Sequence, residues 1–527
     1  LAFLSIYRRK IKMLFYEDET LTEEERRDLK STALKNSRIF NKFFWPDFRT
    51  YPEIELLSEK LILIIKQLPK FEKRKQEKKL KREMAVLLID LYKNYLEDPH
   101  QYLGFYRNHN YYVIKRIEGT KKAARATSKY TGTVYNPCSI GRTIINTVDC
   151  LIELGYIENH KGMRFSGYKK GRVSRIKATD KLIDLFRTSS INDDCLTNKP
   201  TTENVVMFRD EDKNNTKYEE NEAIKEIKDL LFKYNDLLEE TYIDLNLYGK
   251  PLEYIHPKKL PIKVNLRNKY YRRVFNNIES EDGRIISAGG RYYGSWTQQI
   301  PSKLRQRIVM GDPPEETEEV DFSTMHPTIL AAINGFAFDT DPYEIEGYPK
   351  GYRPLFKLIL LVLINSATKD KALRAIEREV RDDSDYEDFK HLNLLTVINN
   401  FEKAHQRIAN HFYTGAGIRC QNIEAAIASN IIRYFTYNNK ILLTVHDSFL
   451  CQKKDSYLLQ KIMISAFKNI LKLKDIMVVE PKLKIVQKDS NNIYLPNAPD
   501  LNLRYKRWKE FNKQIQFKRV LIMKKKE

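Results

Sequence analysis

Two aspartates stand in segments whose residue types suit divalent-metal chemistry. Asp321 follows Val320, where we expect a strand to end and a helix to begin. Asp447 interrupts the apolar stretch from Leu442 to Leu450, which predicts a tight hairpin with an exposed carboxylate at its bend. Carboxylates from adjacent strands form an oxygen-rich site that suits Mg²⁺. Two such ions can hold the attacking and leaving oxygens of a phosphoryl transfer.

Two cations lie between these aspartates in the sequence. Arg353 and Lys357 are spaced i, i+4 on one face of a helix that we expect to end near Asn365. An arginine can bind a triphosphate through paired hydrogen bonds, and a lysine can bind it as a point charge. Two carboxylates for metals and two cations for phosphates are what nucleotidyl transfer requires.

Each of these features also has a purely structural explanation. An aspartate at a strand end often caps the following helix, and two cations one turn apart often form a solvated helix face. The step from His446 to Asp447 is harder to explain by packing, because an unpaired charge inside an apolar strand is costly to bury.

In this order, the segments resemble the palm and fingers of template-directed polymerases, most closely family A, the DNA polymerase I type. The resemblance covers about residues 220–500. It rests on five short motifs: VDFSTMHP from Val320, similar to motif A; RPLFK from Arg353, similar to the fingers helix; VHDSF from Val445, similar to motif C; QIP from Gln299 with Arg305 and Arg307 after it; and QNIEA from Gln421.

The resemblance implies roles in metal and nucleotide binding. Asp321 and Asp447 would bind two Mg²⁺ ions with help from the carbonyl of Phe322, and Mn²⁺ is an alternative ion. Arg353 and Lys357 would bind the triphosphate, and Lys357 would also be a general acid toward pyrophosphate.

Further roles concern the primer, the template and the sugar. By resemblance, His446 would contact the primer terminus, and Gln421, Arg305 and Arg307 would contact the primer–template. His326 falls at the sugar-selecting position, where a bulky ring excludes a 2′-hydroxyl and favours deoxynucleotides. Helices near residues 221–270 would supply a reduced thumb.

Two positions depart from the family A pattern. Asn365 stands in the place of the fingers tyrosine, where it would contact the nucleotide, and Ser448 stands in the place of the motif C glutamate. The sequence His-Asp-Ser-Phe also occurs in the single-subunit RNA polymerases of phages and mitochondria, which share this palm. The choice between deoxy- and ribonucleotides therefore stays open. No Asp-x-Glu exonuclease signature lies upstream, and we expect no proofreading.

The region before the polymerase-like part predicts a DNA-binding domain. A helix from Ser139 to Leu154 stops at Gly155, strands are expected at 156–158 and 173–179, and Asp180 is expected to cap a further helix. This order resembles a winged helix-turn-helix, whose helix enters a DNA groove and whose wing contacts phosphates. A small α+β scaffold with a charged hairpin is the alternative. The basic wing residues are Lys161, Arg164, Lys169, Lys170, Arg172 and Arg175.

The composition favours nucleic acid over a membrane as the partner. The formal net charge of +22 over 527 residues indicates attraction to a polyanion. The longest apolar run, 358–364, is far shorter than the ~20 residues that span a bilayer. Five scattered cysteines without a CxxC pair indicate a reducing, intracellular setting. We expect the cytoplasm or nucleoid, with an organelle left open.

The expected fold class is α+β. It comprises a right-hand polymerase, with an antiparallel palm sheet, helical fingers and a reduced thumb, and an N-terminal winged-helix domain. The expected divisions are a basic helical region (1–83), the winged-helix domain (84–190), a linker (191–220), a thumb-like and pre-palm region (221–310), the palm and fingers (311–500) and a basic tail (501–527).

Three hypotheses about function follow. The leading one is a DNA-directed DNA polymerase that extends a primer with dNTPs during replication of phage, plasmid or mobile-element DNA. The second is a single-subunit RNA polymerase or primase-like enzyme, and the third is a non-catalytic DNA-binding replication initiator or regulator. The expected partners are a DNA primer–template, dNTPs and duplex DNA recognised through the winged helix. The sequence predicts no oligomeric state.

Overall fold

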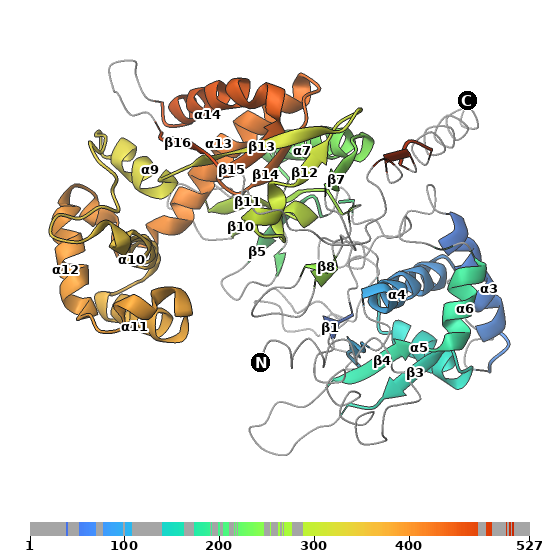
Figure 1. Ribbon diagram of the computed structural model, residues 1–527. Coiled ribbons are helices and arrows are strands. Elements are labelled where there is room, and N and C mark those ends of the chain that lie inside the picture. The colour runs from blue at the N-terminus through green and yellow to red at the C-terminus, as the bar shows by residue number, and fades with distance from the viewer. Residues whose placement is uncertain are drawn as a thin grey trace. The chain divides into compact units, whose positions relative to one another are not determined.

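The computed structural model forms two compact units (Figure 1). One comprises Leu1–Asn204, Leu252–Asn268 and Phe511–Glu527, and the other comprises Val205–Pro251 and Lys269–Glu510. The residues that the structure describes are 38–40, 52–69, 77–97, 101–107, 140–162, 173–189, 191, 199–200, 204–209, 215–216, 218, 220–246, 253–254, 262–263, 266, 268–276, 288–472, 481–486, 502, 505–506 and 508–510.

The first unit contains a four-stranded sheet in the order β1-β2-β4-β3. β4 pairs antiparallel with both β2 and β3, so β3 and β4 form a hairpin. The helices bury apolar residues such as Leu61, Leu87 and Leu151 in one core. The elements are β1 (Arg38–Ile39), α3 (Pro52–Ile65), α4 (Glu77–Glu97), β2 (Leu103–Phe105), α5 (Ile144–Glu153), β3 (Ile157–His160), β4 (Ser174–Ala178), α6 (Asp180–Thr188), β8 (Glu253–Tyr254) and β9 (Ile262–Lys263).

Most elements expected in this unit are present at the expected positions. α5 lies inside the expected helix, and Gly155 after it has a φ of 75°, the left-handed conformation of a helix-terminating glycine. The β3–β4 hairpin occupies the place of the expected wing. The expected cap is wrong: Asp180 is the first residue of α6, and Thr179 before it holds the cap position. The wing residues Arg164, Lys169, Lys170 and Arg172 lie outside the described residues.

The second unit contains two sheets. Five strands follow one another in the order β14-β15-β13-β12-β7, and β16 also pairs with β13; every pairing in this sheet is antiparallel. The other sheet has the order β11-β10-β5-β6, in which only the β5–β10 pairing is parallel. The strands are β5 (Val206–Arg209), β6 (Asn215–Thr216), β7 (Ile243–Leu245), β10 (Arg272–Asn276), β11 (Gly289–Tyr293), β12 (Ile308–Met310), β13 (Glu315–Phe322), β14 (Leu442–Val445), β15 (Ser448–Gln452) and β16 (Leu483–Ile485).

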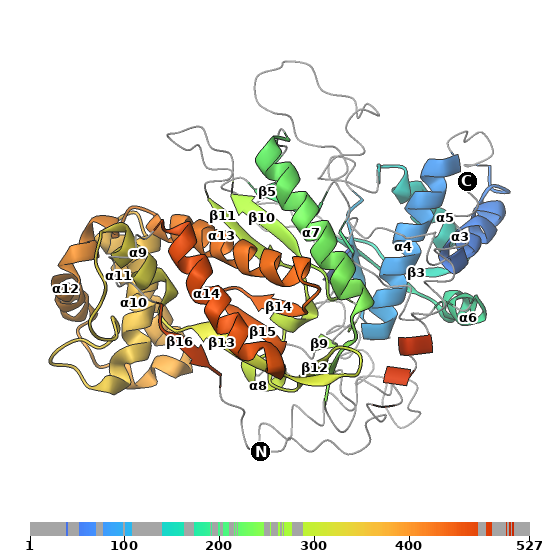
Figure 2. The same ribbon diagram turned by 90° about the horizontal axis from the view of Figure 1, so that it is seen from above.

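One long helix, α13 (Ala416–Tyr437), contacts most parts of the second unit. It packs against β11, α7, α9, α10 and α14, and Figure 2 shows it beside α14. Its buried residues include Glu424, a charge that requires partners inside the protein. The other helices are α7 (Glu222–Glu240), η4 (Trp296–Gln298), α8 (Ser302–Arg305), α9 (Met325–Ile333), η5 (Lys350–Tyr352), α10 (Arg353–Asn365), α11 (Lys369–Asp382), η6 (Ser384–Phe389), α12 (Leu394–Ala404), η7 (Gln406–His411), η8 (Lys453–Asp455) and α14 (Ser456–Ile470).

The α+β class with antiparallel sheets is confirmed, but the expected series of helices over 221–270 is wrong. Only α7 forms there among the described residues, and the described residues from 243 to 270 that have regular structure are strands. α7 is also held against the sheet, because the buried hydroxyl of Tyr234 donates a hydrogen bond to the carbonyl of Leu442 at 2.8 Å. In the described part of the chain, no helix is both long and apolar enough to cross a membrane.

We expect Gly294→Ala to destabilise the second unit by about 2 kcal/mol. Gly294 has a φ of 136°, and an added Cβ would lie 2.6 Å from the carbonyl oxygen of Tyr270. Gly351→Ala is the matched control, since its added Cβ meets nothing within 4 Å. The measurement is the midpoint of urea or thermal unfolding, and equal midpoints for the two variants would contradict the prediction.

Candidate active site

Asp321 and Asp447 are brought together by the pairing of β13 with β15. Asp321 is the register partner of Ser448, the residue after Asp447. The backbone N–H of Phe322 donates to the carbonyl of Asp447 at 3.3 Å, so the β14–β15 turn closes against the end of β13. Asp321 lies within β13 rather than at a helix start, and Asp447 is half-buried rather than exposed at the bend.

The surroundings of Asp321 and Asp447 raise the pKa of both carboxyl groups. Burial, followed by the charges of Asp447 and Glu319, raises the pKa of Asp321 from 3.8 to about 7, while Lys357 and Lys484 partly offset this. Burial and then the charge of Glu424 raise the pKa of Asp447. Two carboxylates held close against their repulsion form a donor set that a hard divalent cation would neutralise, and these residues fit Mg²⁺.

The cations of α10 are placed differently from each other. Lys357 is exposed, and its charge favours ionisation of Asp321. Arg353 instead donates from Nε to Asp341 at 2.9 Å, with its guanidinium 5.0 Å from the ring centre of Tyr343. The structure therefore brings Lys357 within electrostatic reach of Asp321 and gives Arg353 an acidic partner.

Asn365 lies at the last turn of α10, next to α13. Its side-chain amide donates to the carbonyl of Leu361 at 2.8 Å. A Cβ on Gly417 of α13 would lie 2.3 Å from its Oδ1, so the glycine allows this close approach. Asn365 thus contributes to the packing of α10 on α13.

Glu319 is a third carboxylate that the sequence reasoning missed. It is only 3% exposed and accepts hydrogen bonds from Arg305, from Nη2 at 2.7 Å and from Nε at 3.2 Å, and from Ser448 Oγ at 2.6 Å. The alternation of side chains along a strand places Glu319 on the same face as Asp321, and that signal could have identified it. Arg305, expected to contact primer–template, is paired with Glu319 here. Arg307 and Gln421, expected to do the same, are half-buried.

Glu424 forms a second buried charge cluster, with residues of β11 and α9. Its Oε2 accepts from Arg291 Nη2 at 2.5 Å and lies 3.1 Å from His326 Nε2. Burial opposes its ionisation, but the hydrogen bond with His326 and the charge of Arg291 outweigh burial and lower the pKa of Glu424. The expected sugar-selecting His326 is therefore not a free ring, since a carboxylate from α13 holds it.

His446 occupies the turn between β14 and β15. Its φ of 60° is left-handed, and its ring meets Tyr293 edge-on with centroids 5.7 Å apart. Burial and then the charge of Arg291 lower the pKa of His446, which favours the neutral form of the ring. It is adjacent to Asp447 in the sequence and shares the electrostatic environment of the Glu424 cluster.

The described wing residues lie in the other unit. Lys161 is exposed after β3. Arg175 lies in β4 and donates to the carbonyl of Val173 at 3.1 Å. Neither placement tests a role in DNA binding.

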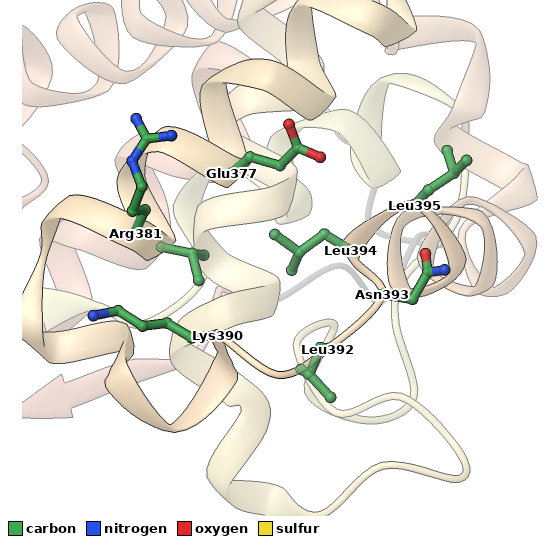
Figure 3. Close-up of a pocket in the computed structure, with 8 residues that line it drawn as sticks. Glu377, Arg381, Lys390, Leu392, Asn393, Leu394 and Leu395 are labelled. Atoms are coloured by element: carbon green, nitrogen blue, oxygen red, sulfur yellow. The ribbon is translucent and has the colours of Figure 1, made fainter.

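Two cavities are found in the described part of the second unit. One of about 460 Å³ is formed by α11, α12 and the segment between them, and Figure 3 shows Arg381 and Lys390 on one side of it. The other, of about 370 Å³, is lined by residues that include Glu319, Gln306 and Lys453. Asp321 and Asp447 line neither cavity.

Comparisons with known proteins identify no family. No protein-family model matches the sequence, and no curated protein matches it. Among solved structures, the chain is similar to the polymerase domain of Pol1 from M. smegmatis in complex with DNA primer-template and dNTP, with 14% identity and a TM-score of 0.23. The match covers 61% of this chain and 57% of that one. A TM-score this low does not establish a common fold.

We expect Arg305→Ala to destabilise the protein by about 3 kcal/mol, because it leaves the buried Glu319 without its cation. The double variant Arg305→Ala/Glu319→Gln should recover part of that loss. Lys454→Ala is the control, since it breaks an exposed ion pair with Glu315 and should change stability by less than about 0.5 kcal/mol. Denaturant unfolding measures all three, and a double variant less stable than Arg305→Ala would exclude this explanation.

We expect Asp321→Asn to stabilise the metal-free protein at pH 8 and to have little effect near pH 4. The folded-state pKa of about 7 lies above the ordinary 3.8, so the penalty of ionising Asp321 accumulates between these values and is complete above pH 7. Melting temperatures in EDTA across this range measure it, with Asp339→Asn, an exposed position, as control. At pH 8, Mg²⁺ should raise the melting temperature of the wild type more than that of Asp321→Asn. A gain that does not depend on pH would contradict the assignment.

Proposed function

We propose that the chain is a DNA-directed DNA polymerase that transfers nucleotides from dNTPs to a primer 3′-hydroxyl with Mg²⁺. The observation that supports this most is the pair Asp321 and Asp447, which come from distant parts of the sequence and lie together at strand ends despite their repulsion. Lys357 is a cation within electrostatic reach of Asp321. This combination matches the chemical needs of phosphoryl transfer.

In the proposed reaction, the primer 3′-oxygen attacks the α-phosphorus, and the bond from that phosphorus to the bridging oxygen of the β-phosphate breaks. Asp321 and Asp447, with the carbonyl of Phe322, would hold the ions that offset the charge of the phosphates. Lys357 would bind the β- and γ-phosphates and give its proton to the leaving pyrophosphate. The proton of the 3′-hydroxyl passes to solvent. Arg353 would approach the triphosphate only by exchanging its contact with Asp341.

The remaining site residues would act on the primer and the sugar. His446, which is next to Asp447, would contact the primer terminus. His326 would select the sugar. Asn365 would contact the nucleotide, and Gln421 and Arg307 would contact the primer–template. Arg305 is paired with Glu319, so it would contact the primer–template only while it keeps that ion pair.

A ribonucleotide-polymerising enzyme is the second candidate. It is favoured by Ser448, which follows Asp447 where family A has a glutamate and which donates its hydroxyl to Glu319. In this candidate the same carboxylates and Lys357 act on rNTPs. The two candidates differ in the sugar and share the chemistry.

We also propose that the first unit binds duplex DNA in the manner of a winged helix. The order α5, β3, β4, with β3 and β4 paired as a hairpin, supports this. The exposed Lys161 lies at the described edge of that hairpin. Such binding would place the second unit on a chosen DNA site during replication.

We expect Asp321→Ala and Asp447→Ala each to reduce primer extension by about 10³-fold or more, since each would remove half of the metal-binding carboxylates. The assay gives the full chain a labelled primer–template, Mg²⁺ and either dNTPs or rNTPs. The matched control is Asp370→Ala, an exposed residue in the first turn of α11, which should keep wild-type activity.

Each outcome of this assay decides between the candidates. Preferred use of dNTPs supports the DNA polymerase, and preferred use of rNTPs replaces it with the second candidate. A wild-type chain that incorporates neither nucleotide, or aspartate variants as active as the wild type, would exclude an enzyme at this site and leave a non-catalytic DNA-binding protein.

A further inference from the structure

An exposed aromatic group lies where α13 ends and α14 begins, outside the site described above. Four tyrosines are exposed among the described residues, and three of them lie in the last turn of α13 or the first turn of α14. These are Tyr434, Tyr437 and Tyr457, of which Tyr437 is 57% exposed and Tyr457 is 70% exposed. Large exposed side chains that gather in one place mark an interaction surface.

Cations accompany these rings. Nζ of Lys233, from α7, lies 4.5 Å from the ring centre of Tyr437 and donates to its hydroxyl at 3.2 Å. Nζ of Lys461 lies 4.4 Å from the ring centre of Tyr457. Arg433 is exposed one helical turn before Tyr437, on the same face of α13. Each part of the aromatic group therefore has a positive charge beside it.

Contacts between the helices make these residues one surface. Lys440, which follows α13, forms an ion pair with Asp455 at 2.5 Å and so joins the end of α13 to the start of α14. α13 also packs against α14 and α7, and Figure 2 shows the three helices together. We call this the tyrosine–lysine surface, and it comprises Tyr434, Tyr437, Tyr457, Lys233, Arg433 and Lys461.

The charge of the helices gives this surface a basic side and a limit. From Ala425 to the end of α13, Arg433 is the charged residue, and α14 has Lys461 and Lys468 but no acidic residue. α7 is different, because Asp229 and Asp236 are exposed on either side of Lys233 along the helix. A polyanion is therefore attracted to α13 and α14 and repelled along α7.

The surface is separate from the paired aspartates. α13 ends just before β14 and α14 begins just after β15, so the tyrosine–lysine surface lies at the open end of the β14–β15 hairpin. Asp447 lies at the closed end of the same hairpin, about 15 Å away along the strands. A ligand at this surface therefore uses residues that the proposed reaction does not use.

The combination of rings and cations specifies the ligand. Unpaired bases stack on exposed aromatic rings, while cations beside the rings bind the phosphates that link the bases. A duplex keeps its base faces inside its own stack, so it would use the cations and leave the tyrosines without a partner. The rings and the cations are used together by a single strand.

We propose that the tyrosine–lysine surface binds single-stranded nucleic acid. Bases stack on the three tyrosines, and phosphates pair with Arg433, Lys461 and Lys233. The inference goes beyond the proposed function and does not assume it, because no step depends on Asp321 or Asp447. DNA and RNA single strands share this chemistry, and the test uses both.

The test measures the affinity of the full chain for labelled oligothymidylate and oligouridylate of about 15 nucleotides, and for a duplex of the same length. Fluorescence anisotropy without Mg²⁺ or nucleotides keeps the reaction out of the measurement. Each change of a surface tyrosine to alanine should weaken single-strand binding by about tenfold, and the triple alanine variant by about 100-fold or more. Duplex binding should change by less than about twofold.

Two variants separate stacking from other effects. The triple tyrosine-to-phenylalanine variant keeps the rings and should keep the wild-type affinity. Leu395→Ala, at an exposed position on α12, is the matched control for loss of a large surface side chain and should also keep it. The tighter of the two oligonucleotides identifies the strand as DNA or RNA, and either supports the proposal if the tyrosines carry the binding.

The cations have a test of their own. Each phosphate contact of a single strand adds about 0.7 to the slope of log affinity against log salt concentration. Arg433→Ala/Lys461→Ala should therefore reduce that slope by about 1.4. An unchanged slope would show that these cations do not contact phosphates and would contradict the proposal.

Two further results would overturn it. One is a triple alanine variant that binds single strands as tightly as the wild type, which would leave the surface to a protein partner. The other is an equal loss of single-strand and duplex binding, which would show that the rings do not stack on bases. Failure of the proposed function is seen separately, as no primer extension, and it does not alter these affinities.

Discussion

The pairing of β13 with β15 is the constraint on which the site depends. It holds Asp321 and Asp447 together in a half-buried position where the charge of Asp447 disfavours ionisation of Asp321. Isolated side chains would move apart or take up protons, but strand register prevents the first. The pairing of the strands therefore keeps the two carboxylates together although their negative charges repel each other. A cation bound at these carboxylates would offset the repulsion.

Two further carboxylates surround this pair, and each is neutralised by its own arginine. Arg305 neutralises Glu319 from the segment before β12, and Arg291 neutralises Glu424 from β11. Because both are nearly inaccessible to water, loss of either arginine would leave a buried charge unpaired. The site thus combines two carboxylates whose pKa is raised with two that are each paired with an arginine.

Local pattern predicted the elements of the site better than it predicted their contacts. The apolar stretch around Asp447 indicated a hairpin, and the cations at Arg353 and Lys357 indicated a helix, because alternation and i, i+4 spacing are properties of a single segment. The pairing of Glu424 with Arg291 depends on how α13 packs against β11, more than a hundred positions apart, which no local pattern reports. For the same reason Arg305 was expected to contact nucleic acid, although its guanidinium forms an ion pair with Glu319.

The left-handed backbone at His446 has an energetic meaning. A non-glycine residue in that conformation costs about 1 kcal/mol or more, and a glycine would remove most of the cost. The hairpin instead carries an imidazole there, with one nitrogen buried and unpaired. His446 therefore makes the protein less stable than a glycine at this position would. The imidazole is retained at a cost to folding, which indicates that the contacts of the ring matter.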